Sequence, residues 1–143
     1  MSSSVRLCRV NPWEVPFAWE FVAPELERAI VFCDGESAMA DIWKSLITGQ
    51  HTLWIVFDDD AQDMLCCLTT FVHDYDKKRS LFIHLLAGRN ASSFIEAEPE
   101  LVSFAKSIGC STISSLVIPR VAKRMQRVAP QYKTTHLLMV RTL

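Results

Sequence analysis

The chain has 143 residues, half of them hydrophobic and 22% charged, which excludes a disordered, collagen-like or low-complexity protein. No apolar run is long enough to cross a membrane, and the net charge at pH 7 is only −1. We therefore expect a single domain over residues 1–143, with a core that needs neither disulfides nor a metal. The five cysteines, an odd number with no CxxC motif, indicate free thiols in a reducing compartment.

The small net charge hides a division along the chain. Residues 1–100 hold all 16 acidic residues and eight basic ones, whereas residues 101–143 hold seven basic residues and no acidic one. These balances of −8 and +7 can neutralise each other within the fold, pair head to tail between subunits, or bind an anion.

Prolines dominate the first predicted elements. Because Pro12, Pro16 and Pro24 interrupt residues 12–33, we predict short helical pieces there, with Pro24 in a first helical turn.

A second helix is predicted from a Ser37 cap to about Thr48, with Gly49 just after its end. Its apolar residues recur at helical spacing and share one face: Met39, Ile42, Trp43 and Leu46.

Three strands follow in the middle of the chain. Runs of β-branched and aromatic residues predict strands at Thr52–Phe57, Met64–His73 and Ser80–Ala87. The polar residues 58–60 and 74–79 between them predict a turn and a hairpin loop.

The last third alternates between helices and strands. A helix is predicted around Pro99, with this proline in its first turn and Gly109 at its end. A strand at Thr112–Ile118, a short basic helix between Pro119 and Pro130, and a strand at Thr134–Arg141 complete the chain. The fold class is therefore α+β or mixed α/β, with N-terminal helices and then β-β-β-α-β-α-β around a mostly antiparallel sheet of five to six strands.

This order, together with four internal phrases, resembles the GCN5-related N-acetyltransferase (GNAT) fold, above all its short divergent forms in bacteriophages, including small internal virion proteins of short-tailed phages. The phrases are LWIV at 53–56, LLAGRNA at 85–91, FAKSIGC at 104–110 and RVAPQYKTT at 127–135. The resemblance covers about residues 25–140 and implies an acyl-CoA site and transfer of acetyl to an amine.

The phosphate-binding loop of such a fold falls at Gly88, Arg89, Asn90 and Ala91. The resemblance calls for two small residues at alternate positions, where this chain has one glycine. Three carboxylates follow near the start of the helix, and there they would compete with a phosphate for its positive end: Glu96, Glu98 and Glu100. We expect a degenerate site, with no cofactor in a structural role and acetyl-CoA in an active enzyme.

No catalytic residue is assigned from the sequence alone. The central strands carry no glutamate, so His84 and Tyr132 are the candidates for base and acid, each with a packed, hydrogen-bonded core role as the alternative. Cys66 and Cys67 are expected to be small core residues.

Metal binding finds no support in the sequence. The four histidines lack zinc-site spacing, and Asp58–Asp63 lacks the glycine and terminal glutamate of a calcium loop, so we expect no metal.

A stripe of basic residues lies on the late helix at Arg120, Lys123, Arg124 and Arg127. It could contact phosphates, but no aromatic residue is interleaved with it, which disfavours nucleic acid as a partner.

Residues 1–24 are expected to form an N-terminal arm that contacts another chain, because four large aromatics crowd into it: Trp13, Phe17, Trp19 and Phe21. The basic stripe would face an acidic surface of that partner, which is a virion component or another copy.

Three functions follow, in order of preference: a structural or binding component of a phage, an N-acetyltransferase, and a nucleic-acid binder. Without a secretory signal core, we expect the protein in the cytoplasm of an infected bacterium or inside the virion, with no membrane contact.

Overall fold

The computed structural model of the protein describes residues 4–31, 38–117, 119–136 and 139–143. One five-stranded sheet runs in the order β1 (Val5–Val10), β2 (Thr52–Asp58), β3 (Asp63–Asp74), β4 (Arg79–Ala87) and β5 (Thr112–Ser115). The first four strands pair antiparallel, and β5 pairs parallel to β4. The predicted α+β class with a mostly antiparallel sheet is confirmed.

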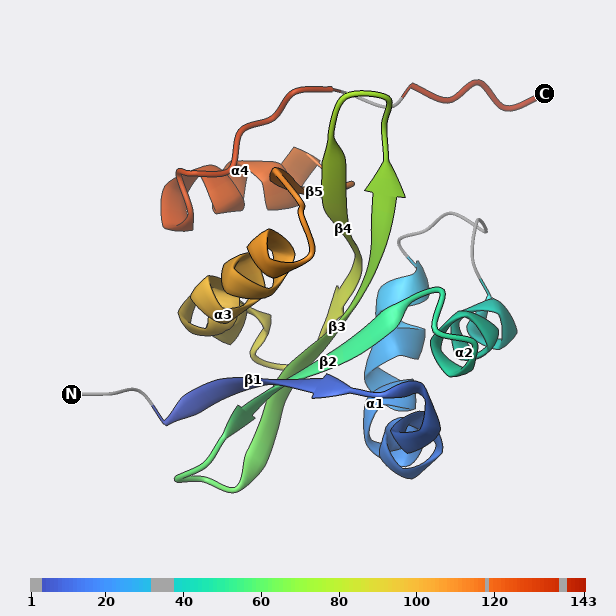
Figure 1. Ribbon diagram of the computed structural model, residues 1–143, viewed down its shortest axis with the longest axis vertical. Coiled ribbons are helices and arrows are strands. Elements are labelled where there is room, and N and C mark those ends of the chain that lie inside the picture. The colour runs from blue at the N-terminus through green and yellow to red at the C-terminus, as the bar shows by residue number, and fades with distance from the viewer. Residues whose placement is uncertain (1–3, 32–37, 118, 137–138) are drawn as a thin grey trace.

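Helices cover both faces of this sheet, and Figure 1 shows α3 (Phe94–Ser107) on one side with α1 (Val15–Ile30) and α2 (Met39–Ile47) on the other. Each face has its own apolar core. Leu68, Leu81 and Leu101 belong to the core beneath α3, while Leu26 and Leu53 belong to the core beneath α1 and α2. Both faces of the central strands are thereby buried, which explains their continuous apolar runs.

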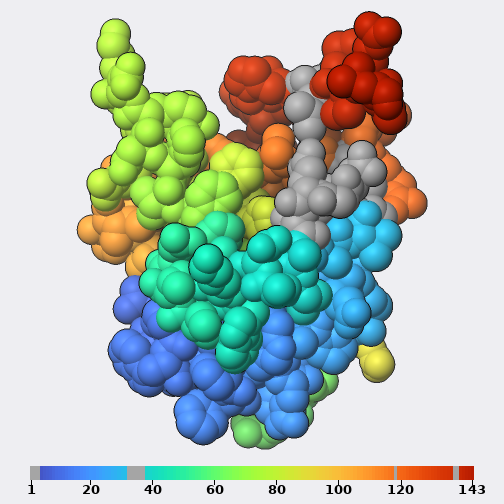
Figure 2. Space-filling view, turned by 90° about the vertical axis from the view of Figure 1, so that its right-hand side faces the viewer, coloured from blue at the N-terminus to red at the C-terminus, as the bar shows by residue number. Residues whose placement is uncertain are grey.

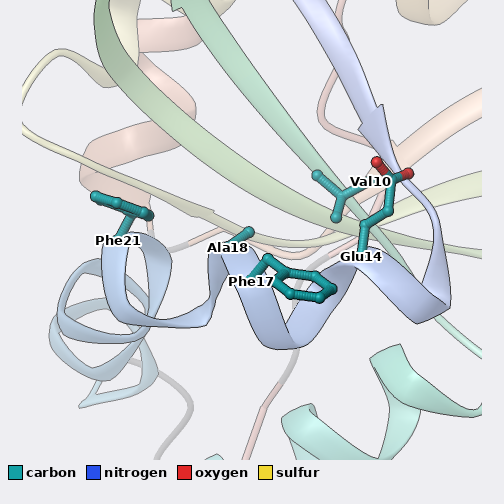
Figure 3. Close-up of a pocket in the computed structure, with 5 residues that line it drawn as sticks. All are labelled: Val10, Glu14, Phe17, Ala18 and Phe21. Atoms are coloured by element: carbon teal, nitrogen blue, oxygen red, sulfur yellow. The ribbon is translucent and has the colours of Figure 1, made fainter.

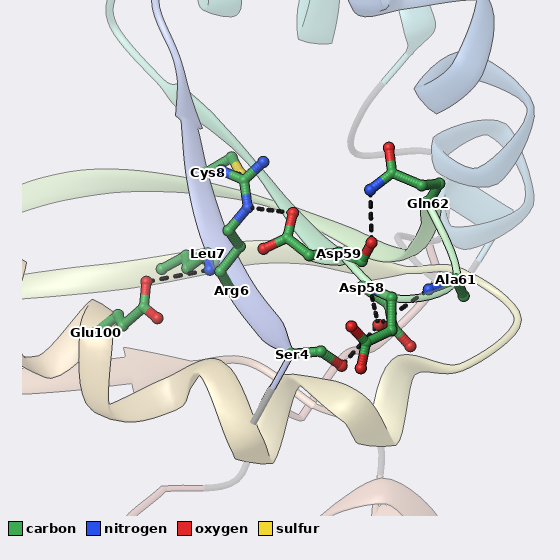
Figure 4. A network of polar contacts seen from close by, with 10 residues as sticks. Ser4, Arg6, Leu7, Cys8, Asp58, Asp59, Ala61, Gln62 and Glu100 are labelled. Carbon is green, nitrogen blue, oxygen red and sulfur yellow. Dashed lines mark hydrogen bonds and ion pairs between the residues drawn. The ribbon is translucent and has the colours of Figure 1, made fainter. Parts of the chain in front are cut away.

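The first strand was missed in the sequence, where residues 1–24 were expected to be an arm. β1 pairs with β2 along its whole length, from Val5 opposite Asp58 to Val10 opposite Leu53. Side chains hold β1 on both sides (Figure 4): Arg6 Nε donates to Asp59 Oδ1, just after β2, at 2.8 Å, and on the other side the Leu7 N–H donates to Glu100 Oε2 at 3.1 Å. This part of the expected arm is therefore built into the sheet.

The predicted short helical pieces are wrong, because α1 is one helix of 16 residues preceded by the 3₁₀ turn η1 (Pro12–Glu14). Pro16 lies in the first turn, where a missing N–H has no cost. Pro24 lies inside the helix instead of opening one, and Figure 1 shows the first turns of α1 at an angle to its last ones. Burial of Val22 and Leu26 stabilises the helix across this proline.

The second helix largely follows its prediction. α2 begins at Met39, the expected Ser37 cap lies outside the described residues, and Gly49 ends the helix with φ of 80°. The strand predictions at 52–57, 64–73 and 80–87 are confirmed to within one residue at each end.

The helix predicted around Pro99 begins five residues before that proline. A 3₁₀ turn, η3 (Ala91–Ser93), leads directly into α3 at Phe94, so Pro99 is inside the helix and on its exposed side. The buried residues Phe94, Ala97 and Leu101 determine where the helix begins.

The chain after β5 departs most from prediction. β5 ends at Ser115 rather than at residue 118, which lies outside the described residues, and α4 (Pro119–Val128) forms as predicted. The strand expected at Thr134–Arg141 is wrong, since residues 134–136 and 139–143 form none, and residues 137–138 lie outside the described part. Figure 1 shows this tail running away from the β5 edge, where a strand would find its partner.

Candidate acyl-transfer site

The parallel pair of strands β4 and β5 separates halfway along β4. Their register ends at Ile83 opposite Ser115, while β4 continues to Ala87. The Ser115 hydroxyl donates to the Ile83 carbonyl at 2.9 Å at this point. Beyond it, no described strand pairs with the β5 side of β4, so backbone groups there are placed to bind an extended ligand.

A β-bulge lies at the same point. Ile83 pairs with Thr70 and Leu85 pairs with Thr69, so His84 is an extra residue on β4. Ile83 belongs to the core under α3 and Leu85 to the core under α1 and α2. The bulge therefore re-aims the side chains of β4, and it brings the His84 ring against His51.

Four rings from the strands β3 and β4 and from the α2–β2 connection form one cluster. Phe71 stacks on His51 with ring centroids 4.8 Å apart and on Phe82 with centroids 4.9 Å apart. His84 meets His51 edge to face at 5.4 Å. Figure 2 shows the surface hollowed above α2, beside the β3–β4 hairpin.

Both imidazoles are only half-buried, yet their pKa values are lowered. Burial lowers the pKa of His84, and burial followed by the charge of His84 lowers the pKa of His51. A lowered pKa keeps each ring neutral at pH 7, which is the state that accepts a proton. His84 was a candidate base from the sequence, whereas His51 was not recognised, because its approach to His84 depends on the strand order and the bulge.

The expected phosphate loop is shaped mainly by the neighbouring strand. A Cβ on Gly88, whose φ is 140°, would lie 2.7 Å from the Cys66 Cα, so this glycine allows β4 to approach β3 closely. The Asn90 N–H donates to the Leu65 carbonyl at 3.3 Å, so it is not available to a phosphate. Arg89 and Asn90 border a cavity of about 650 Å³ that acidic side chains also line. The free edge of β4 therefore fits an extended cofactor arm better than this loop fits a pyrophosphate.

The three carboxylates near α3 do not act together on that loop. Glu100 accepts the Leu7 N–H, and Glu98 accepts a hydrogen bond of 3.2 Å from the Tyr132 hydroxyl. The helix begins at Phe94, so only Glu96 lies in its first turn. Two of the expected competitors with a phosphate are thus bonded to protein donors.

Tyr132 and His84 lie in different layers of the fold. Tyr132 packs beside Glu98 on α3, whereas His84 contacts His51 on the α2 side. Burial, and then the charge of Glu98, raise the pKa of the Tyr132 hydroxyl, which stays protonated and donates only weakly. The structure does not bring the two candidates together.

The cysteine pair on β3 is part of the core, as expected. Cys66 and Cys67 are fully buried, and burial raises the pKa of both thiols, that of Cys67 to about 12. Such thiols are not activated nucleophiles.

The residues expected to contact a partner have different surroundings. Trp19 packs edge to face on Trp43 with centroids 4.9 Å apart. Trp13, Phe17 and Phe21 are exposed by 72%, 79% and 61%, respectively. The basic stripe of Arg120, Lys123, Arg124 and Arg127 is exposed on α4.

Within the residues that the structure describes, no helix combines the length and apolar character that crossing a bilayer requires. In the same residues, no three His, Cys, Asp or Glu side chains are grouped to hold a metal ion. Asp58 instead accepts hydrogen bonds at the β2–β3 turn, from the Ser4 hydroxyl at 2.7 Å (Figure 4) and from the Asp60 N–H at 3.0 Å. The Ser4 bond is the main cause of its lowered pKa.

Comparisons with known proteins find a similar architecture in solved structures of acetyltransferases. No protein-family profile and no curated protein matches the sequence. Among solved structures, an aminoglycoside acetyltransferase from an uncultured soil sample, in complex with sisomicin, is similar with a TM-score of 0.67 and 13% identity, over 97% of this chain and 96% of that one.

Two further acetyltransferases show the same likeness. Aminoglycoside N-acetyltransferase AAC(6′)-Iy in complex with CoA has a TM-score of 0.65 and 13% identity, over 99% of this chain and 97% of that one. Glucosamine-6-phosphate N-acetyltransferase from Arabidopsis thaliana has a TM-score of 0.62 and 7% identity, over 96% and 97%. At such identities the likeness concerns the fold, and the chain has a GNAT-like fold.

Proposed function

We propose that the protein is an N-acetyltransferase that moves an acetyl group from acetyl-CoA to an amine. The observation that carries this proposal is the coincidence of the β4–β5 separation at Ile83 with the bulge at His84. An open strand edge and a neutral imidazole then lie next to each other in the chain. The solved neighbours that act on amines or hold CoA support the same choice.

For this reaction the protein must hold the acetyl donor next to the amine and provide a base that removes a proton from the amine. Bound acetyl-CoA would supply a thioester, whose carbonyl carbon bonds to the amine nitrogen as the carbon–sulfur bond breaks and the CoA thiolate leaves. His84 accepts the proton that the amine nitrogen loses, and its lowered pKa keeps it ready near pH 7. The edge of β4 from Leu85 to Ala87, beyond the last residue that pairs with β5, would hold the extended arm of the donor by backbone hydrogen bonds.

The proposal is tested by incubating the protein with acetyl-CoA and a panel of amines: an aminoglycoside, an amino sugar, an arylalkylamine and a lysine peptide. Mass spectrometry should detect an acetylated product. His84→Gln should lower kcat about 100- to 10,000-fold, because a general base is removed. His73→Gln, at an exposed histidine of β3, is the matched control and should keep full activity. If no amine gives a product and calorimetry detects no binding of acetyl-CoA, the proposal that the protein is an acetyltransferase is wrong.

Tyr132 offers a second test of the same proposal. Its hydroxyl donates to Glu98 and is separated from the His84 cluster by the sheet. If Tyr132 supplies the proton that the leaving thiolate takes up, Tyr132→Phe should reduce kcat without changing KM for the amine. A variant that loses only stability, by about 0.5–1.5 kcal/mol for one hydrogen bond, assigns Tyr132 to the packing of the C-terminal segment.

A second candidate function is a non-catalytic binding component of the phage type, in a virion or in an infected cell. It is favoured by the loop at Gly88, where the Asn90 N–H is already bonded to Leu65 and no second glycine follows. Calorimetry with CoA distinguishes the two. A dissociation constant in the low micromolar range supports the enzyme, and absence of binding with intact folding supports the binding component.

A further inference from the structure

Helix α4 is unusual in this fold because none of its ten residues is buried. An isolated helix of this length is marginal in water, since helices shorter than about 12–15 residues rarely persist without packing. Within the described residues, Ala122 and Met125 of the helix are only partly buried, and the firmest anchor lies just past its end, where Ala129 is buried and Tyr132 bonds to Glu98. The rest of α4 is exposed, so a further surface that covers it would stabilise the helix.

The exposed surface of α4 has two adjoining sides. One carries the basic stripe of Arg120, Lys123, Arg124 and Arg127. The other carries Val121 and Val128, which are 37% and 50% exposed. A suitable cover must therefore offer both apolar surface and negative charge.

Helix α1 and the turn before it offer this combination. Trp13, Phe17 and Phe21 recur every four residues along one side, and we call these three the aromatic strip. Glu14 and Glu20 are exposed beside them.

A hollow lies next to the aromatic strip. Phe17 and Phe21 stand at the rim of an open cavity of about 430 Å³, which Val10, Glu14 and Ala18 also line (Figure 3). This hollow has room for an apolar side chain of a partner, with a carboxylate at its border.

We propose that a second copy of this chain binds here, with the basic stripe and valines of its α4 against the aromatic strip of α1. The charges are complementary, because the balance is −8 over residues 1–100 and +7 over residues 101–143. Figure 1 shows α4 and the first turns of α1 at opposite corners of the molecule, so the contact joins two molecules and cannot form within one. The proposal is independent of the acetyltransferase activity.

Sedimentation velocity of the full chain over about 1 µM to 1 mM, at low and high salt, tests this proposal. We expect self-association that rises with concentration. The double variant Phe17→Ala, Phe21→Ala should weaken it about 30-fold or more, because buried aromatics dominate such contacts. Tyr75→Ala, at an exposed aromatic of the β3–β4 hairpin, is the matched control and should change nothing.

Charge reversal tests the pairing of the two surfaces. Arg124→Glu should weaken self-association about two- to fivefold, and adding Glu20→Arg should restore most of the loss, since exposed ion pairs contribute little each. Lys77→Glu on the hairpin should have no effect. A chain that stays monomeric at every concentration, or an assembly indifferent to both the aromatic and the charge variants, overturns the proposal. A monomer whose α4 variants instead lose binding to a DNA duplex overturns it in favour of nucleic acid.

Discussion

The imidazole rings of His51 and His84 meet edge to face with their centroids 5.4 Å apart. His51 stands just before β2 and His84 in the bulge of β4, and Phe71 of β3 lies against both rings. The pair is thus brought together by the α2–β2 connection and by β4, with Phe71 of β3 packed against both rings. Because each ring loses water to its neighbours, protonating either one is costly, and the pair favours the neutral state.

The first prediction concerns the pH dependence of turnover. A general base must be neutral, and burial lowers the pKa of His84 below its ordinary value of 6.5. The acid limb of the kcat profile should therefore fall at a pH below 6.5 and disappear in His84→Gln. Rates measured across the acidic range with a fixed, saturating amine check this. An acid limb unchanged in His84→Gln would show that another group is the base.

The second prediction concerns stability and follows from the same shifts. Because the folded pKa values of His51 and His84 are lowered, the unfolded chain binds more protons once the pH drops below about 6.5. The free energy of unfolding should be unaffected above this pH and should fall as the pH decreases towards the folded pKa values.

Urea unfolding at several pH values measures this slope. The double variant His51→Leu, His84→Leu should reduce it, whereas His73→Gln, at an exposed position, should not. A double variant with the slope of the original protein would mean that other groups cause the acid sensitivity.

Much of the sheet could be predicted from the sequence, because the residues of each central strand themselves indicate a buried strand. β2, β3 and β4 are long apolar runs buried on both faces, so their side chains alone identify them. α4 was found from the prolines at both ends, Pro119 and Pro130.

The sequence predictions fail where an element depends on contacts with residues far away in the chain. β1 is short and carries two arginines, Arg6 and Arg9, like a solvated tail, and its partner strand β2 lies far along the chain. Pro24 and Pro99 are tolerated inside helices because buried neighbours such as Leu26 and Leu101 hold those helices against the sheet.

The candidate site also has one part that the sequence could predict and another that depends on the fold. His84 could be selected from the sequence because it is the polar residue in an apolar strand. The proximity of His51, and the separation of Tyr132 from both, depend on strand order and on which face each helix covers. No local pattern carries that information.

The third prediction concerns the loop after β4. Gly88→Ala should destabilise the protein by about 2–5 kcal/mol, because its Cβ would meet the Cys66 Cα at 2.7 Å and its φ of 140° strains any other residue. Gly109→Ala is the matched control, since its φ is 82° and nothing lies within 4 Å of the new Cβ. It should cost only about 1–2 kcal/mol. Urea unfolding compares the two, and equal losses would contradict the role given to Cys66.

The fourth prediction compares two adjacent threonines on β3. The Thr70 hydroxyl accepts a buried hydrogen bond of 2.8 Å from Trp54 Nε1, whereas the Thr69 hydroxyl is buried beside the bulge without a partner among the described residues. Thr70→Val should therefore cost about 1–3 kcal/mol, because the indole N–H is left unsatisfied.

Thr69→Val removes a hydroxyl that makes no bond and keeps nearly the same shape, so stability should stay unchanged or rise by about 1 kcal/mol. Urea unfolding of both variants, with tryptophan fluorescence and circular dichroism as readouts, decides between them. The two side chains point to opposite faces of the same strand, so any general effect of valine on β3 applies to both. If Thr69→Val lowers the free energy of unfolding as much as Thr70→Val does, the Thr69 hydroxyl has a hydrogen-bond partner, and the prediction is wrong.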